Sequence, residues 1–135
     1  DDDTVNQMWQ FGEDAGIAFQ IKDDIFDYDR SAVTGKPHGI DIRDRKMTLP
    51  LIYLLNHSGA TEKRWIITTV KSYSTDADRV GHLIRKVSEA GGIDYARAKM
   101  TEYRNKAIAM LHRYPAGPYR DSLEKLVIYT TERTT

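Results

Sequence analysis

Apolar residues recur at helical spacing through most of the chain, and the strict alternation that is typical of strands is scarce. The pattern predicts an all-α protein, an array of about six helices without an internal repeat or an interdomain linker. The expected helices are Thr4–Tyr28, Leu49–Asn56, Glu62–Tyr73, a helix that is capped by Ser74-Thr75-Asp76 and ends at Glu89, Ile93–Arg113 and Pro118–Glu132.

The first predicted helix carries three carboxylates on one side. At about 100° per residue, Asp23, Asp24 and Asp27 share a stripe with Gln20. Most of the remaining circumference is apolar, with Phe11, Ala15, Ala18, Phe19, Ile21, Ile25 and Phe26. Because a helix of this kind is largely buried, carboxylates that face inward must be paired with positive charge or hold their protons.

Carboxylate oxygens with neither cysteine nor patterned histidine nearby suit a hard divalent cation such as Mg²⁺. This ion keeps much of its water and commonly shares one or two protein carboxylates with a phosphorylated substrate. The alternative is an acidic helix end that faces water, where like charges four residues apart cost only about 0.2–0.5 kcal/mol. The apolar surroundings and the segment that follows favour the metal site.

Residues 34–50 are predicted to form a loop, because two glycines and a proline interrupt regular helix. The segment carries four basic residues, Lys36, Arg43, Arg45 and Lys46. Alone, such a segment is most simply a solvated loop. Next to the carboxylates, it would complete a layered arrangement of carboxylate, divalent ion, anion and ammonium that suits a polyphosphate.

Three blocks of sequence, at 16–27, 35–41 and 46–50, read GIAFQIKDDIFD, GKPHGID and KMTLP. Together they resemble the second aspartate-rich region of the trans-prenyltransferases, the polyprenyl diphosphate synthase family. That family's pattern is G-x-x-F-Q-x-x-D-D-x-x-D, then G-K-x-x-G-x-D, then K-x-T-L-P. The compound motif is highly specific, whereas the rest of the chain is similar to the family only in its amphipathic helices and basic C-terminal end.

The resemblance implies a role for each matching polar residue. Asp23 would bind Mg²⁺ directly, and Asp24 and Asp27 would hold the ion through water or orient its direct ligands. Lys36 and Lys46 would contact the diphosphate.

Two further residues of the first block differ in what they imply. Gln20 would line the pocket of the allylic substrate. Phe19 also belongs to the pattern, but by its spacing it is more simply a core residue that fixes the orientation of the helix.

The implied reaction is ionisation of an allylic diphosphate, attack by the double bond of isopentenyl diphosphate on the carbocation, and loss of a proton. It requires no protein nucleophile. The barrier lies in separating a cation from an anionic leaving group, so metal ions and lysines that stabilise charge on the diphosphate provide the catalysis. An apolar cavity would shield the carbocation from water.

The chain departs from the family in its length and in the lack of another D-D-x-x-D motif. At 135 residues, it is similar to the C-terminal part of a single all-helical domain with the isoprenoid synthase type of fold. We expect this part alone to be inactive, because a phosphate held from one side is not positioned for ionisation.

Composition narrows the classes of function. Twenty acidic and twenty basic residues give a formal charge of zero, which provides no overall field that favours nucleic acid. No apolar run approaches the roughly 18 residues of a membrane span, and there is no cysteine for disulfides or thiolate metal sites. The resemblance implies a cytoplasmic enzyme that is a homodimer at full length.

Two other functions are compatible with the helical pattern. A non-catalytic subunit of a heteromeric prenyl synthase would keep the fold, but it would have no need of the intact carboxylate and lysine set. A terpene cyclase or head-to-head isoprenoid synthase would use related carbocation chemistry, but those families usually carry a differently spaced second metal motif.

Overall fold

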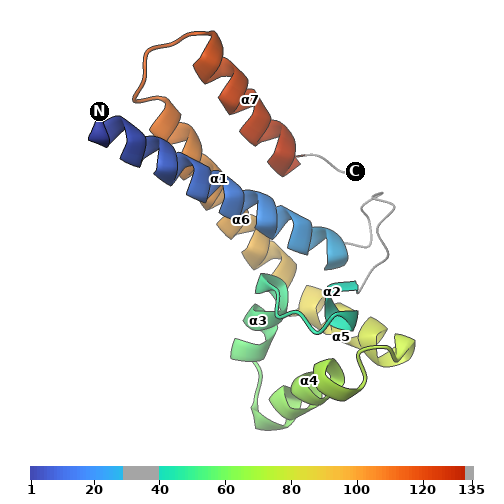
Figure 1. The fold of residues 1–135 in the computed structure, drawn as a ribbon. Coiled ribbons are helices and arrows are strands. Elements are labelled where there is room, and N and C mark those ends of the chain that lie inside the picture. The colour runs from blue at the N-terminus through green and yellow to red at the C-terminus, as the bar shows by residue number, and fades with distance from the viewer. Residues whose placement is uncertain (29–39, 133–135) are drawn as a thin grey trace. The chain divides into compact units, whose positions relative to one another are not determined.

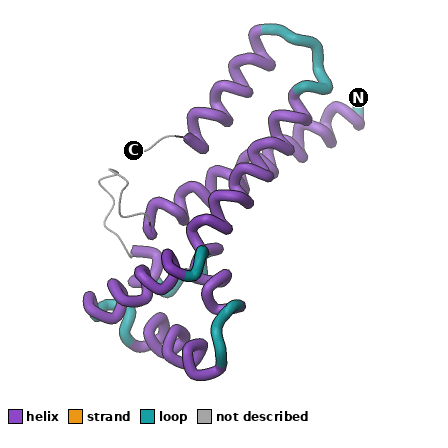
Figure 2. Tube along the Cα trace, turned by 180° about the vertical axis from the view of Figure 1, so that it is seen from behind, coloured by secondary structure: helices purple, strands orange, loops and turns teal. Residues whose placement is uncertain are grey.

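The computed structural model describes residues 1–28 and 40–132, and these residues form seven α-helices (Figure 1). No strand occurs within the described ranges (Figure 2). The helices are α1 (Asp2–Tyr28), α2 (Ile40–Arg43), α3 (Leu49–Asn56), α4 (Ala60–Ser72), α5 (Ala77–Glu89), α6 (Gly92–Leu111) and α7 (Pro118–Glu132). The all-α prediction is therefore confirmed.

The chain divides into two compact units. The first combines Asp1–Lys22 with the described residues from Ala98 to Glu132, and the second comprises the described residues from Asp23 to Arg97. Helices α1 and α6 contribute residues to both units. The acidic stripe of α1 belongs to the second unit from Asp23 onward.

The first unit is held together by a small apolar core. Phe11 of α1 packs with Ala107 and Leu111 of α6 and with Val127 of α7. The spacing of four between Ala107 and Leu111 places both on one face of α6. Helices α6 and α7 form a hairpin, which can be followed in the ribbon of Figure 1 and in the tube of Figure 2. The Tyr114 hydroxyl, between these helices, donates to Gln7 Oε1 of α1 at 2.8 Å.

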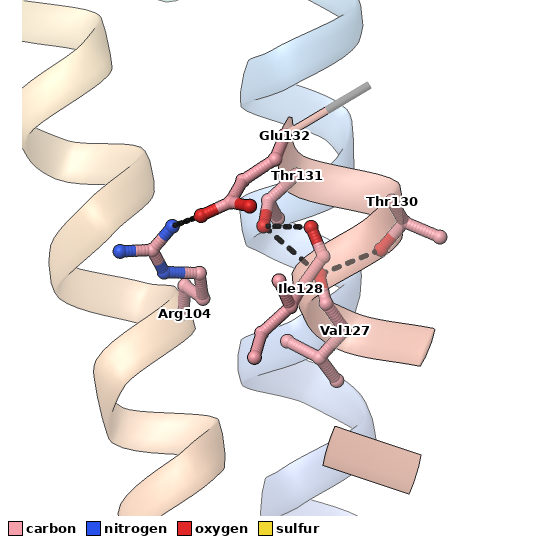
Figure 3. A network of polar contacts seen from close by, with 6 residues as sticks. All are labelled: Arg104, Val127, Ile128, Thr130, Thr131 and Glu132. Atoms are coloured by element: carbon pink, nitrogen blue, oxygen red, sulfur yellow. Dashed lines mark hydrogen bonds and ion pairs between the residues drawn. The ribbon is translucent and has the colours of Figure 1, made fainter. Parts of the chain in front are cut away.

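Polar contacts close the C-terminal end of this hairpin (Figure 3). Arg104 of α6 lies 3.2 Å from the carboxylate of Glu132 on α7, Nη1 to Oε1. The Thr131 hydroxyl donates back to the Val127 carbonyl at 2.9 Å. Because the Glu132 side chain is largely exposed, the ion pair contributes at most about 1 kcal/mol, so apolar packing provides most of the stability of the unit.

The second unit has a larger core, to which the end of α1 and helices α2 to α5 contribute buried residues. The core residues are Tyr28, Ile42, Leu51, Leu54, Ile66, Val70, Leu83, Ile84 and Val87. Asp76 caps α5 as predicted, because its carboxylate accepts hydrogen bonds from the backbone N–H groups of Asp78 and Arg79. The core thus fixes α2 and α3, which flank the segment that contains Arg45 and Lys46, against α4 and α5.

The structure differs from the predicted helices at residues 40–43, in the number of helices and in the start of α1. Residues Ile40–Arg43 are helical, although the segment was expected to be a loop, so the number of helices in the described ranges is seven. A four-residue helix is too short to show a periodic pattern, and it forms here because another part of the chain supplies its N-terminal hydrogen bonds. The chain also enters α1 earlier than expected, at Asp2, and Asp1 accepts from the Thr4 N–H at 2.8 Å.

The prediction that Phe19 is a core residue is wrong. Its side chain is 39% exposed, whereas Ala18 beside it is fully buried. Val5 and Trp9 on the same helix are more exposed still. Helix α1 therefore buries a narrower face than its composition indicated. In the first unit, the buried face of α1 is the one that packs against α6 and α7.

The described ranges contain no helix with both the length and the apolar character that a membrane crossing requires.

Gly92 opens α6 in close contact with α3, and this contact generates a prediction. A Cβ atom at this position would lie 2.6 Å from the Pro50 carbonyl oxygen and 3.1 Å from the Val87 side chain. Because the closest atom belongs to the backbone, Gly92→Ala should destabilise the chain by about 1–3 kcal/mol, measured by urea unfolding. Gly12→Ala is the matched control, since nothing lies within 4 Å of its Cβ position, and it should be neutral or stabilising by up to about 1 kcal/mol. Equal effects of the two changes would contradict the steric explanation.

Candidate metal and diphosphate site

The last two turns of α1 concentrate negative charge. Asp23 and Asp24 are partly buried and Asp27 is fully buried, and the last turn of the helix contains no basic residue. The helix dipole is negative at this end, so each carboxylate here is disfavoured by about 0.3–1 kcal/mol relative to a neutral group. The arrangement favours a cation.

Asp23 is the carboxylate of the stripe for which the described residues provide no partner. It makes no hydrogen bond or ion pair with any residue in the described ranges, although it is partly buried. A partly buried carboxylate without a partner is costly unless a bound cation compensates it. Asp23 is therefore the group in this stripe best suited to direct metal binding.

Asp27 is satisfied by the backbone instead. Its Oδ1 accepts from the N–H of Ile40 at 2.9 Å, and its Oδ2 accepts from the N–H of Asp41 at 3.1 Å. These are N–H groups of the first turn of α2, which have no partner within that helix. The Asp27 carboxylate thus caps α2 and joins the end of the acidic helix to the start of the basic segment.

Asp41 continues this connection to Lys46. The carbonyl of Asp41 accepts from the Lys46 N–H at 2.8 Å, and the carbonyl of Ile42 accepts from the Arg45 N–H at 2.9 Å. This pair of bonds is the Schellman ending of a helix, in which the residue at the position of Arg45 adopts the left-handed conformation. Arg45 has φ +61°. The backbone of Lys46 is thereby linked to Asp27 through a single intervening residue.

A second connection joins Tyr28, the last residue of α1, to Thr48, the residue before α3. The Tyr28 hydroxyl and the Thr48 hydroxyl are 2.7 Å apart and hydrogen-bonded, and both residues are buried. Burial raises the pKa of the Tyr28 hydroxyl well above its ordinary value of 10.0, and the charges of Asp27, Asp41 and Asp24 raise it further, partly opposed by the bond to Thr48.

The remaining predicted site residues lie in different surroundings. Lys46 is exposed, and its ammonium makes no ion pair with the described residues. Gln20 is exposed on the part of α1 that belongs to the first unit. Lys36 falls outside the described residues. The structure thus brings Asp24, Asp27 and the Lys46 backbone into one neighbourhood through Asp41 and Tyr28.

Within the described ranges, no three His, Asp or Glu side chains are grouped closely enough to hold a metal ion by themselves. Mg²⁺ does not require such a cage, because it commonly uses one or two carboxylates together with water and substrate phosphate oxygens. The donor set of Asp23 and Asp24 fits that mode of binding.

Sequence reasoning gave no individual role to three residues of this neighbourhood: Tyr28, Asp41 and Thr48. Asp41 and Thr48 belong to the matched motif, so the motif itself was the available signal. Tyr28 follows the carboxylates directly, but nothing in its spacing indicates that it meets a residue twenty positions later.

The class of protein that these observations define is an all-helical protein with a carboxylate-bearing helix joined by backbone capping to a basic segment. Residues 1–87 match the sequence pattern of the polyprenyl synthetase family, and the chain belongs to that family. The match includes the acidic stripe and the basic segment, so the resemblance seen in the motif is confirmed.

Individual relatives agree with this membership. The chain is 33% identical over 132 residues to the chloroplastic solanesyl diphosphate synthase 1 of Arabidopsis thaliana, covering 97% of this chain and 31% of the relative. It is 30% identical over 127 residues to the octaprenyl diphosphate synthase of Escherichia coli, covering 93% of this chain and 39% of the relative. The chain thus spans less than half the length of these relatives.

Solved structures share the fold. The geranylgeranyl pyrophosphate synthase of Bacteroides thetaiotaomicron matches with a TM-score of 0.87 and 34% identity, over 98% of this chain and 44% of that one. The polyprenyl synthase of Caulobacter crescentus, solved in complex with calcium and isoprenyl diphosphate, matches with a TM-score of 0.84 and 27% identity, over 100% of this chain and 42% of that one. The helical arrangement is therefore that of the isoprenoid synthase fold.

The buried pair of Tyr28 and Thr48 generates a prediction about pH. Because the pKa of Tyr28 is raised in the folded chain, its proton is held more tightly there than in the unfolded chain. Stability that depends on this group is present below pH 10 and is lost as the pH rises above it. Tyr28→Phe should remove this part of the alkaline loss of stability, and near pH 7 it should cost about 1 kcal/mol through the lost hydrogen bond.

Urea unfolding at pH 7 and at several values above 10 would measure both effects. Tyr129→Phe is the matched control, because Tyr129 is 66% exposed, and it should leave both quantities unchanged. An alkaline profile of Tyr28→Phe that superimposes on that of the unaltered chain would contradict the prediction.

Proposed function

We propose that this chain forms the C-terminal part of a polyprenyl diphosphate synthase, which condenses isopentenyl diphosphate with an allylic diphosphate to extend a trans-polyprenyl diphosphate. The observation that carries the proposal is the partly buried Asp23 carboxylate without a partner in the described ranges, on a helix end joined by backbone hydrogen bonds to the segment that contains Lys46. Membership of the polyprenyl synthetase family supports it.

The acidic residues would divide the work of holding Mg²⁺. Asp23 would be the direct ligand, and Asp24 would hold the ion through its water. Asp27, whose two oxygens already accept backbone N–H groups, would act by fixing the helix end and the segment that follows. The ion, when bound, would neutralise the diphosphate as it leaves.

The basic and polar residues would act on the substrate. Lys46 and Lys36 would bind the diphosphate oxygens and stabilise the charge that develops when the bond to the allylic carbon breaks. Gln20 would line the pocket of the allylic chain. Because the chain spans less than half the length of the relatives it matches, we expect it to lack activity when it is produced alone.

The metal role of Asp23 is tested by Asp23→Asn in the full-length protein. The change keeps the size of the side chain and removes its charge, so Mg²⁺-dependent condensation should fall by about a hundredfold or more, with little change in helical content by circular dichroism. Asp121→Asn, on the exposed face of α7, is the control and should keep full activity. Turnover of Asp23→Asn equal to that of the control would rule out the assigned role.

The role of the lysines is tested by Lys46→Ala. Loss of one charge-assisted contact should raise the KM for the allylic diphosphate about tenfold and lower kcat, measured by steady-state condensation at fixed Mg²⁺. Lys125→Ala, which also removes an exposed ammonium, is the control. We expect Lys36→Ala to act like Lys46→Ala. If both changes left KM and kcat at the control values, the basic segment would be ordinary surface.

A further inference from the structure

Arg45 has an unfavourable backbone conformation that a different residue would relieve. It is the only residue other than glycine with positive φ in the described ranges, at +61°. An L side chain in this region brings its Cβ too close to the following carbonyl oxygen. Glycine is the usual residue at this position of a Schellman ending, followed by asparagine.

The side chain of Arg45 makes no contact in the described ranges that would compensate for this strain. It is exposed, and its guanidinium makes no hydrogen bond, ion pair or ring contact with the residues that the structure describes. The hydrogen bonds that shape the turn are made by backbone groups, from the N–H of Arg45 to Ile42 and from the N–H of Lys46 to Asp41. Glycine would preserve both of them.

The location of the turn indicates what the guanidinium could bind. Arg45 directly precedes Lys46, and the Asp41 backbone joins this turn to the buried carboxylate of Asp27. Two adjacent cationic side chains therefore leave the same turn, at the C-terminal end of α2, whose N-terminal N–H groups are capped by Asp27 of the acidic stripe. Guanidinium is suited to phosphate, because its planar fork can donate two parallel hydrogen bonds to phosphate oxygens.

We infer that Arg45 is a further diphosphate-binding residue, which contacts the substrate diphosphate alongside Lys46. This inference rests on the proposed function. Strained backbone is found preferentially at functional sites, where the surrounding structure maintains it. Here the capping of α2 by Asp27 and the Schellman bonds hold the turn, so the strained conformation of Arg45 is maintained.

The test uses two substitutions in the full-length protein that both remove the charge but differ in their backbone preference. Arg45→Gly relieves the left-handed strain, and Arg45→Gln keeps it. Both should raise the KM for the allylic diphosphate about tenfold. Arg45→Gly should also keep or raise the thermal unfolding midpoint without substrate, because no stabilising contact is lost. Arg45→Lys should retain part of the affinity, and Arg64→Gln, on the exposed face of α4, is the control.

The outcomes separate this inference from the proposed function. If Asp23→Asn and Lys46→Ala impair condensation but both charge-removing changes at Arg45 leave KM at the control value, the assignment of Arg45 is wrong and the proposed function stands. A rise in KM for only one of Arg45→Gly and Arg45→Gln would indicate a backbone effect and would also overturn the assignment. If the full-length protein condenses the two diphosphates and none of these changes affects the reaction, the roles of Asp23, Lys46 and Arg45 all fail; if it shows no condensation at all, the proposed function itself fails.

Discussion

The capping of α2 by the buried carboxylate of Asp27 is the interaction on which the candidate site depends. A helix of four residues cannot form alone, because its nucleation is unfavourable and its terminal N–H groups are unsatisfied. Asp27 accepts two of these N–H groups, and Ile42 anchors the helix in the core of the second unit. The burial of a charge, which is normally costly, is offset by these charge-assisted hydrogen bonds.

This constraint makes the three aspartates of the stripe unequal. Asp27 has both oxygens engaged by backbone N–H groups, whereas Asp23 has no partner in the described ranges. In the sequence the carboxylates of the motif look alike. In the fold, Asp27 has a structural role, and Asp23 is available to a cation. Within the pattern D-D-x-x-D, the last aspartate therefore holds the segment that follows, and the first makes no such contact.

The same constraint determines how charge is distributed around the site. Asp41 connects the acidic end of α1 with the turn that presents Arg45 and Lys46. The hydrogen bond between Tyr28 and Thr48 links the end of α1 to the residue before α3. The acidic end of α1 and the turn that presents Arg45 and Lys46 are therefore linked by hydrogen bonds to backbone and hydroxyl groups. Of the charged side chains in this neighbourhood, those of Asp23, Arg45 and Lys46 make no ion pair within the described ranges.

The sequence by itself determined the helical class, the bounds of α3 and α7, the capping role of Asp76 and the membership of the family, because these depend on local periodicity, on capping residues and on a specific motif. Only the tertiary structure decided that α2 exists, that Phe19 is exposed, that Asp27 is a cap and that Arg45 is strained. These features depend on contacts between residues far apart in the chain, or on backbone conformations that a neighbouring element imposes. Contacts of this kind produce no periodic pattern of apolar residues, so they cannot be predicted from the sequence alone.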